Sequence, residues 1–100
     1  MDTFNKQPAE SIDYTLDFSE ALNTGDALAL ESPTVTLGLM TGIGEVPTVE
    51  AVTVNTALSC VKVRVAGGVS GQVCALNCVV NTVTGERLEG DARIKIKEIR

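Results

Sequence analysis

Apolar and polar residues alternate one by one in several segments of the chain. The alternation is clearest near the middle, where Val61, Val63 and Val65 are separated by Lys62 and Arg64. A period of two places successive side chains on opposite faces of a β-strand. This segment therefore predicts a half-buried strand whose valines face the core and whose basic side chains face outward.

The same pattern recurs at spacings near ten residues, which predicts about six or seven strands. They are expected over residues 11–18, 34–39, 49–54, 59–66, 73–80 and 93–99. Residues 73–80 are apolar on both faces, so this strand is predicted to be central or to lie at an interface. In residues 93–99 the outward positions are basic, which is typical of an edge strand because charge discourages stray pairing. Residues 27–31 are ambiguous between helix and strand.

Glycine-rich segments separate these strands. Residues 67–71 and 82–87 predict tight turns, and so does the Asn-Thr-Gly-Asp segment over residues 23–26. Residues 40–47 predict a longer loop that carries two apolar residues, Ile43 and Val46. Apolar side chains on an exposed loop indicate a contact surface, and the alternative is a loop that folds back over the core.

Composition supports an all-β domain. The 100 residues include 13 Val, 5 Ile and 11 Thr, and branching at Cβ suits a pleated, half-buried surface. A chain of this length forms one domain, and the usual architecture is a sandwich of two sheets. We expect an antiparallel β-sandwich of six to eight strands over residues 11–100, preceded by an extended N-terminal arm over residues 1–10.

Charge and residue usage exclude several classes of function. The chain has no histidine and no tryptophan, and its net charge is −5. Without histidine, catalytic triads and His-ligated metals are excluded, and a negative chain is a poor partner for nucleic acid or an anionic membrane. No apolar run approaches the roughly 20 residues of a membrane span. From the acidic, polar start we expect no signal peptide.

The cysteines and the aspartates do not form the pattern of a disulfide, a metal site or a catalytic site. The chain has three cysteines, Cys60, Cys74 and Cys78, and this odd number favours reduced, buried thiols. Cys74 and Cys78 on one strand lie about 13 Å apart, too far for a disulfide. Asp13 and Asp17 are separated similarly, beyond the spacing of glycosidase carboxylates. We expect no enzymatic activity, no cofactor and no metal; a cross-strand bridge from Cys60 is the minor alternative.

Charge is distributed unevenly along the chain. Residues 1–50 carry nine acidic and one basic residue, whereas residues 51–100 carry four acidic and seven basic residues. Strands from both halves interleave in a sandwich, so the charges average out over the surface in one interpretation. In the other, an acidic face and a basic edge meet between neighbouring copies in an assembly.

A longer stretch of the sequence resembles a known family. Residues 61–85 form an alternating strand, Gly67-Gly68 with Gly71 three residues later, a second strand, and a Thr-rich turn that ends at Gly85. This order resembles the C-terminal half of small phage virion proteins called fiber–tail adaptors. Earlier in the chain, Lys6-Gln7-Pro8, an Asp-Tyr strand and a Gly-Asp turn are similar to the start of that family.

The resemblance implies an immunoglobulin-like sandwich that is present in many copies on a tailed phage virion and joins tail and fibre components. It implies assembly in the bacterial cytoplasm, in agreement with the reduced thiols. The partners would be other virion proteins and further copies of the chain. The arm would become ordered against a neighbour, so removing residues 1–8 is expected to weaken incorporation without unfolding the domain. The partner contacts are predicted at Phe4, Pro8, Ile43, Val46, Lys62, Arg64, Lys95 and Lys97.

Two other functions stay open on the sequence. A capsid cement or decoration protein has the same composition. A module that binds carbohydrate or another host surface group would need exposed aromatic rings. Tyr14 is the single tyrosine and falls on the predicted core face, although stacking on a sugar is its alternative role.

Overall fold

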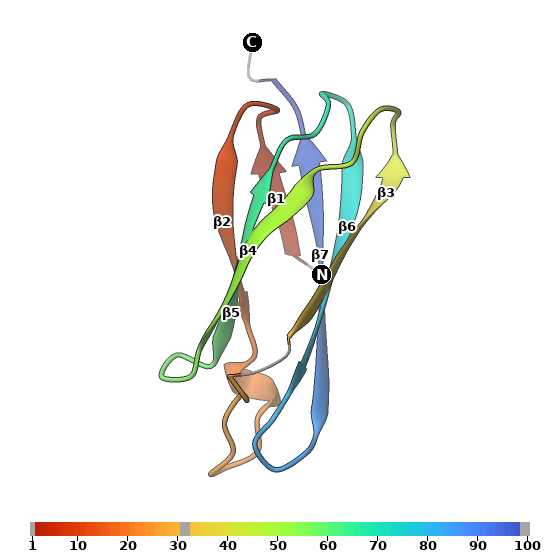
Figure 1. The fold of residues 1–100 in the computed structure, drawn as a ribbon. Coiled ribbons are helices and arrows are strands. Elements are labelled where there is room, and N and C mark those ends of the chain that lie inside the picture. Colours follow the sequence, from red (N-terminus) through yellow and green to blue (C-terminus); the bar gives the residue numbers. More distant parts are fainter. Residues whose placement is uncertain (1, 31–32, 99–100) are drawn as a thin grey trace.

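The protein is a sandwich of two β-sheets in the computed structural model, which describes residues 2–30 and 33–98 (Figure 1). One sheet has the strand order β1-β7-β6-β3 and the other has the order β2-β5-β4. A short 3-10 helix, η1 (Ser19–Ala21), follows β2. The strands are β1 (Asp2–Lys6), β2 (Ser11–Asp17), β3 (Thr34–Thr41), β4 (Thr48–Asn55), β5 (Cys60–Ala66), β6 (Val73–Asn81) and β7 (Arg87–Ile96). The all-β prediction and the strand number are confirmed.

The division of strands between the sheets resembles that of an immunoglobulin constant domain. If the strands are lettered in chain order, β2, β5 and β4 correspond to B, E and D, and β3, β6 and β7 to C, F and G. The first strand differs, because β1 pairs in parallel with β7 instead of joining β2. The antiparallel pairing expected for residues 11–100 is confirmed, and the parallel pair involves residues 2–6, which were expected as an arm.

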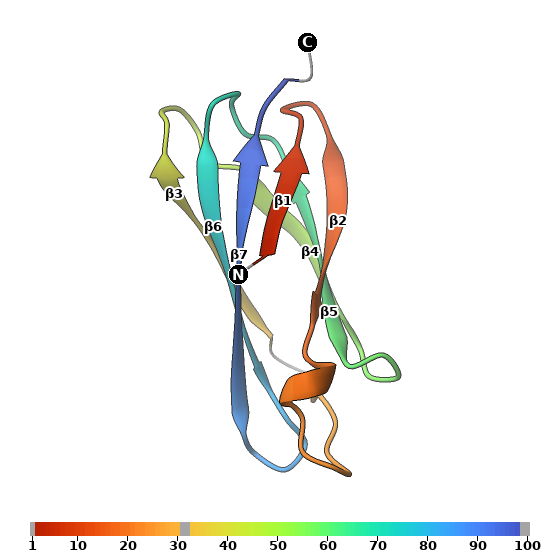
Figure 2. The ribbon, with the colours of Figure 1, turned by 180° about the vertical axis from the view of Figure 1, so that it is seen from behind.

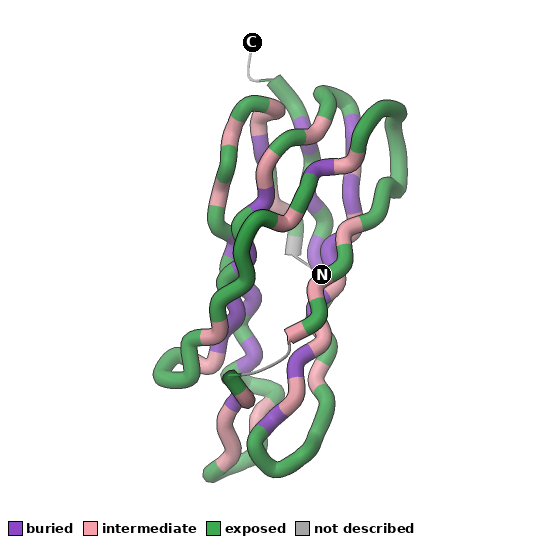
Figure 3. The backbone as a smooth tube through the Cα atoms, viewed as in Figure 1, coloured by how far each residue is buried: buried purple, intermediate pink, exposed green. Residues whose placement is uncertain are grey.

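The core lies between the sheets and is built from the inward positions of the alternating strands (Figure 3). Val61, Val63 and Val65 of β5 are fully buried, and Leu76 of β6 and Ile94 of β7 are buried across from them. Their removal from water is the main term that stabilises so small a domain. The sequence pattern identified this core correctly.

The N-terminal segment is a strand of the sandwich. Residues 2–6 pair with residues 92–96 of β7, and the Lys97 amide donates to the Lys6 carbonyl at 2.9 Å. The Tyr14 hydroxyl on β2 donates to the Asn5 carbonyl at 3.0 Å, and the Phe4 ring stacks on the Tyr14 ring. The segment expected as an extended arm is thus extended, but it closes one side of the domain.

Pairing with β1 changes the place of the last strand. Because β1 covers its free side, β7 lies between β1 and β6 and is not the edge strand that its lysines predicted. The prediction for residues 73–80 is confirmed, since β6 lies between β7 and β3. Its outward residues Val73, Ala75 and Val79 are half-buried.

The ambiguous segment 27–31 is not helical over its described residues. Leu28 is buried and forms an isolated β-bridge with Thr82, while Glu31 lies outside the described residues. The three cysteines are free thiols and all are buried. Burial raises the pKa of Cys78 to about 11 and also raises that of Cys74.

Candidate functional site

The connections between strands gather at the two ends of an elongated molecule. Its extents are 46 × 20 × 20 Å, with the strands running along the length (Figures 1 and 2). The upper end, as drawn in Figure 1, consists of residues 7–10, 42–47 and 67–72 together with 97–98. The lower end consists of residues 18–30, 56–59 and 82–86. The remaining surface is formed by the outer faces and edges of the sheets.

At the upper end, one buried side chain holds two loops together. Gln72 is 1% exposed, and its Nε2 donates to the carbonyls of Glu45 at 2.9 Å and Ile43 at 3.3 Å. Its Oε1 accepts from the Val69 amide at 2.8 Å. With all three hydrogen bonds formed, the buried Gln72 side chain fixes the backbone around it. The loss of any of these bonds would leave a buried polar group without a partner.

The loop that Gln72 holds presents a large apolar side chain to solvent. Ile43 is 85% exposed and stands between Gly42 and Gly44, both with positive φ (97° and 107°). A side chain at Gly42 would meet the Gln72 backbone, and one at Gly44 would meet Val69. The glycines thus permit a close approach of the two loops, and Val69 stays partly exposed beside Ile43.

A buried lysine organises the other side of the upper end. Lys6 is 2% exposed, and its Nζ donates to the carbonyls of Gly67 at 2.6 Å, Gln7 at 2.8 Å and Pro8 at 3.3 Å. Burial lowers the pKa of this ammonium, whereas the nearby charge of Glu10 raises it. The carbonyls take the place of water around the cation, which binds β1 to the turn after β5.

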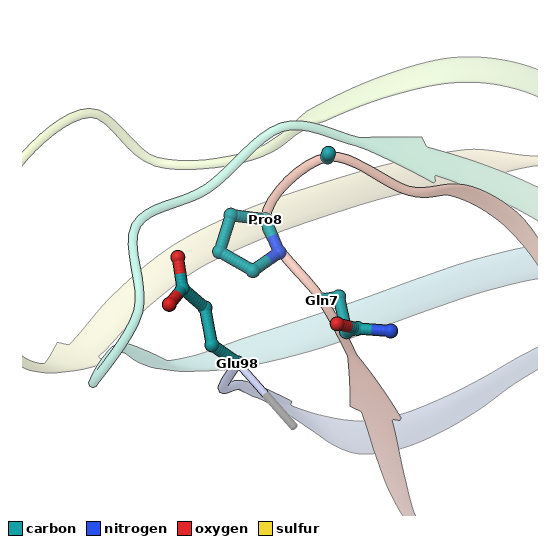
Figure 4. Close-up of a pocket in the computed structure, with 4 residues that line it drawn as sticks. Gln7, Pro8 and Glu98 are labelled. Atoms are coloured by element: carbon teal, nitrogen blue, oxygen red, sulfur yellow. The ribbon is translucent and has the colours of Figure 1, made fainter. Parts of the chain in front are cut away.

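A small pocket lies next to this lysine. It is lined by Gln7, Pro8 and Ala9 of the β1–β2 connection and by Glu98, and Pro8 faces Glu98 (Figure 4). Its volume is about 230 Å³, which is below the usual size of a site for a small-molecule ligand.

The lower end also exposes large apolar side chains. Leu30, Leu58 and Val83 are 72%, 67% and 64% exposed. The backbones at Val83 and Leu58 are held in place, since the Val83 amide donates to the Ala27 carbonyl at 2.9 Å and the Leu58 amide donates to Asn55 Oδ1 at 3.1 Å. Both ends of the molecule therefore expose large apolar side chains on loops whose backbones are hydrogen-bonded.

The basic residues singled out from the sequence lie on opposite faces. Lys62 and Arg64 point outward from β5, and Arg64 forms a salt bridge with Asp13 on β2 at 2.8 Å. The hydrogen bond from Arg64 lowers the pKa of Asp13. Lys95 lies on the outer face of the other sheet, beside Asn5 of β1. The structure does not bring these two basic pairs together.

The other predicted contact residues divide between the upper end and the interior. Pro8 and the half-buried Val46 lie at the upper end with Ile43, and Lys97 is exposed just after β7. Phe4 is half-buried, and its ring centroid is 4.6 Å from that of Tyr14. The Tyr14 ring is 7% exposed, so it is not available for stacking on a sugar.

Over the described residues, His, Cys, Asp and Glu do not gather in groups of three or more that could hold a metal ion. The same part of the chain contains no helix long and apolar enough to cross a membrane.

A comparison with protein families decides what kind of protein this is. Residues 6–95 match the family described as Podophage GP4 fiber-tail adaptor protein gp77. The chain belongs to this family. It is accordingly a structural component of the phage virion, of the kind that joins tail and fibre proteins, and the resemblance noted in the sequence is confirmed. A search of curated proteins gives no match.

The residues that organise the ends of this fiber–tail adaptor were missed by sequence reasoning. Lys6 and Gln72 are polar, and no hydrophobic pattern in the sequence singles them out as buried. A weak signal was available for Leu58 and Val83, because each is an apolar residue in a segment otherwise made of turn-forming or small residues. In a small adaptor, such residues are the first to examine for contacts with partners.

Proposed function

We propose that this adaptor joins tail and fibre components through its two ends, one partner binding at the upper end and the other at the lower end. The observation that carries the proposal is the exposure of large apolar side chains at both ends, with Ile43 at one and Leu58 and Val83 at the other. A partner that covers such side chains removes them from water, which favours association.

Rigidity of the loops supports the same proposal. Gln72 donates hydrogen bonds to the carbonyls of Ile43 and Glu45 in the loop of Ile43. The Leu58 amide donates a hydrogen bond to the side chain of Asn55. A loop that is already ordered loses little conformational entropy when a partner binds. The 46 Å length of the domain then acts as a spacer between the two partners.

Polar residues surround the apolar ones at each end. The upper end carries Glu10, Glu45 and Glu98 with Lys97, and the lower end carries Glu20, Asp26 and Glu86, so both ends are acidic on balance. Partners of opposite charge would be steered to each end. Several copies arranged around one tail would multiply individually weak contacts, so we include multi-copy assembly in the proposal.

Binding measurements with two end variants test the proposal. Ile43→Asp and Leu58→Asp each place a carboxylate in one apolar patch. We expect each variant to lose at least about tenfold in affinity for one purified partner, the tail or the fibre protein of the same phage, and to keep the other. Thr53→Asp is the matched control, because Thr53 is exposed on β4 away from both ends.

The outcomes separate the proposal from its alternatives. If both variants lose the same partner, the two ends do not serve different proteins. If neither variant loses a partner, the contacts lie on the sheet faces. Density for the adaptor on the capsid shell of an imaged particle would instead support a decoration role.

A further inference from the structure

Strand β3 forms an unprotected edge of the four-stranded sheet. It pairs with β6 on one side, and its other side faces away from the domain in both views (Figures 1 and 2). Pairing with β6 is regular from Thr34 to Leu39, and the register shifts only between Leu39 and Thr41. Such an edge carries backbone donors and acceptors that can pair with a further strand.

The other three edges of the sandwich are each blocked. Asn5 on β1 accepts a hydrogen bond from Tyr14 of the facing sheet. The edge strand β2 carries Asp13 and Asp17, and the edge strand β4 carries Glu50 at its register shift. Charged residues are a usual means by which edge strands prevent edge-to-edge association. Strand β3 has no charged residue between Thr34 and Thr41.

The surface next to β3 is uncharged as well. Strand β6, its neighbour, contains no Asp, Glu, Lys or Arg, and its outward side chains include the half-buried Ala75 and Val79. The whole chain has a net charge of −5. Two copies that approach along β3 therefore bring together the parts of the sheet with the least like-charge repulsion.

We propose that two copies of this chain pair through β3, antiparallel and related by a two-fold axis at Leu37. In this register Val35 faces Leu39 of the second copy, and Thr36 faces its Gly38. Val35, Leu37 and Leu39 of both copies share the inner face, where Leu39 is still 38% exposed in the single chain. The sequence of β3 is thus complementary to itself, as an isologous interface requires.

The pairing would join two four-stranded sheets into one continuous sheet of eight strands. Main-chain hydrogen bonds supply affinity in strand addition, and the alternating side chains set the register. The inference specifies a contact for the multi-copy assembly in the proposed function and rests on that part of it. Because the strands pair antiparallel, the upper end of one copy lies beside the lower end of the other, and both ends of each copy stay exposed to partners.

Sedimentation equilibrium of the isolated full chain tests the pairing over a range of concentrations. We expect the mass to rise from 10.5 kDa to twice that value. Hydrogen exchange of the β3 amides is expected to slow over the same range. Gly38→Lys places a charge at the edge, and the monomer tolerates it, because Gly38 has no positive φ and a Cβ there meets nothing within 4 Å. It should weaken pairing about tenfold or more.

Thr53→Lys, on the edge strand of the other sheet, is the matched control and should dimerise normally. Ile43→Asp should do so too, which separates this test from that of the end contacts. The proposal is overturned if the chain stays monomeric throughout, or if Gly38→Lys pairs as well as the natural sequence. Protection of β3 that arises only after a purified tail or fibre protein is added also overturns it, and assigns the edge to that protein.

Discussion

The rings of Phe4 and Tyr14 stack with their centroids 4.6 Å apart and their planes inclined by 17°. The contact joins β1 in one sheet to β2 in the other, next to the bond from the Tyr14 hydroxyl to the Asn5 carbonyl. These two strands lie on the same side of the sandwich and close it there (Figure 2). The N-terminal segment therefore contributes to the stability of the domain.

We predict that Phe4→Ala destabilises the isolated domain by about 2 kcal/mol, since a half-buried ring and its stacking partner are lost. Deletion of residues 2–5 should cost more, in contrast to the mild effect expected from the sequence. Urea denaturation followed by circular dichroism measures both changes. Thr3→Ala, at the exposed neighbouring position, is the control. Equal midpoints for all variants would show that β1 is dispensable for folding.

We predict that Gln72→Ala loosens two loops at once. The substitution removes a donor for the carbonyls of Ile43 and Glu45 and an acceptor for the Val69 amide. The loss should be about 2 kcal/mol in unfolding free energy, with faster hydrogen exchange at Val69. The same change at Gln7, whose side chain is half-buried, should have a smaller effect. An unchanged exchange rate at Val69 would argue against this role.

We predict that Lys6→Met destabilises the domain by about 1–3 kcal/mol, because the carbonyls of Gln7, Pro8 and Gly67 lose a common donor. Chemical denaturation at pH 7 measures the change, with Lys97→Met as an exposed control. Methionine fills most of the volume of the lysine side chain, so the packing around residue 6 is little altered. A more stable Lys6→Met protein would mean that burying the ammonium costs more than its three bonds return.

We predict that the domain loses stability in alkali, and that the buried Cys78 and Tyr14 contribute to this loss together with Cys74, whose pKa burial also raises. Burial raises the pKa of Cys78 from 9.0 to about 11 and that of Tyr14 from 10.0 to about 12. The folded chain then holds protons that the unfolded chain has released. The stabilisation from these groups is complete below pH 9 and is lost between pH 9 and 12.

Variants assign the alkaline effect to each group. Tyr14→Phe should flatten the dependence of unfolding free energy between pH 10 and 12, by at most about 2 kcal/mol once solvent screening is allowed for. Cys78→Ala should flatten it between pH 9 and 11. Lys6 acts in the opposite direction through its lowered pKa, but it is common to all these proteins and cancels in the differences. Parallel curves for all variants would contradict the assignment.

The strands in which apolar and polar residues strictly alternate were predictable. Successive side chains of a strand point to opposite faces, and in a sandwich one of these faces is buried. Val61, Val63 and Val65 face the core in the structure as they do in the sequence pattern. Strand β1 was not predictable in this way. Its inward positions are Phe4 and Lys6, and a lysine that satisfies its charge with carbonyls is invisible to a hydrophobic pattern.

The place of a strand within a sheet depends on which other strands pair with it, and the sequence of one strand does not show this. Lys95 suggested an edge, but β1 occupies that side of β7. In the same way, the sequence placed Lys62 and Lys95 on outer faces without showing that these faces are opposite. Ile43 was found because it stands between two glycines in a loop, whereas the buried Gln72 that fixes its position looked like any other polar residue.

Successive connections of the chain alternate between the two ends, and the fully buried valines of β5 lie between them. Substitutions at one end therefore leave the backbone of the other undisturbed. Under the proposed division of partners between the ends, a lineage acquires a new fibre by altering one set of loops while it keeps its attachment to the tail. Chimeras that exchange residues 42–47 and 67–72 as a unit would retain the Gln72 bonds that both loops share.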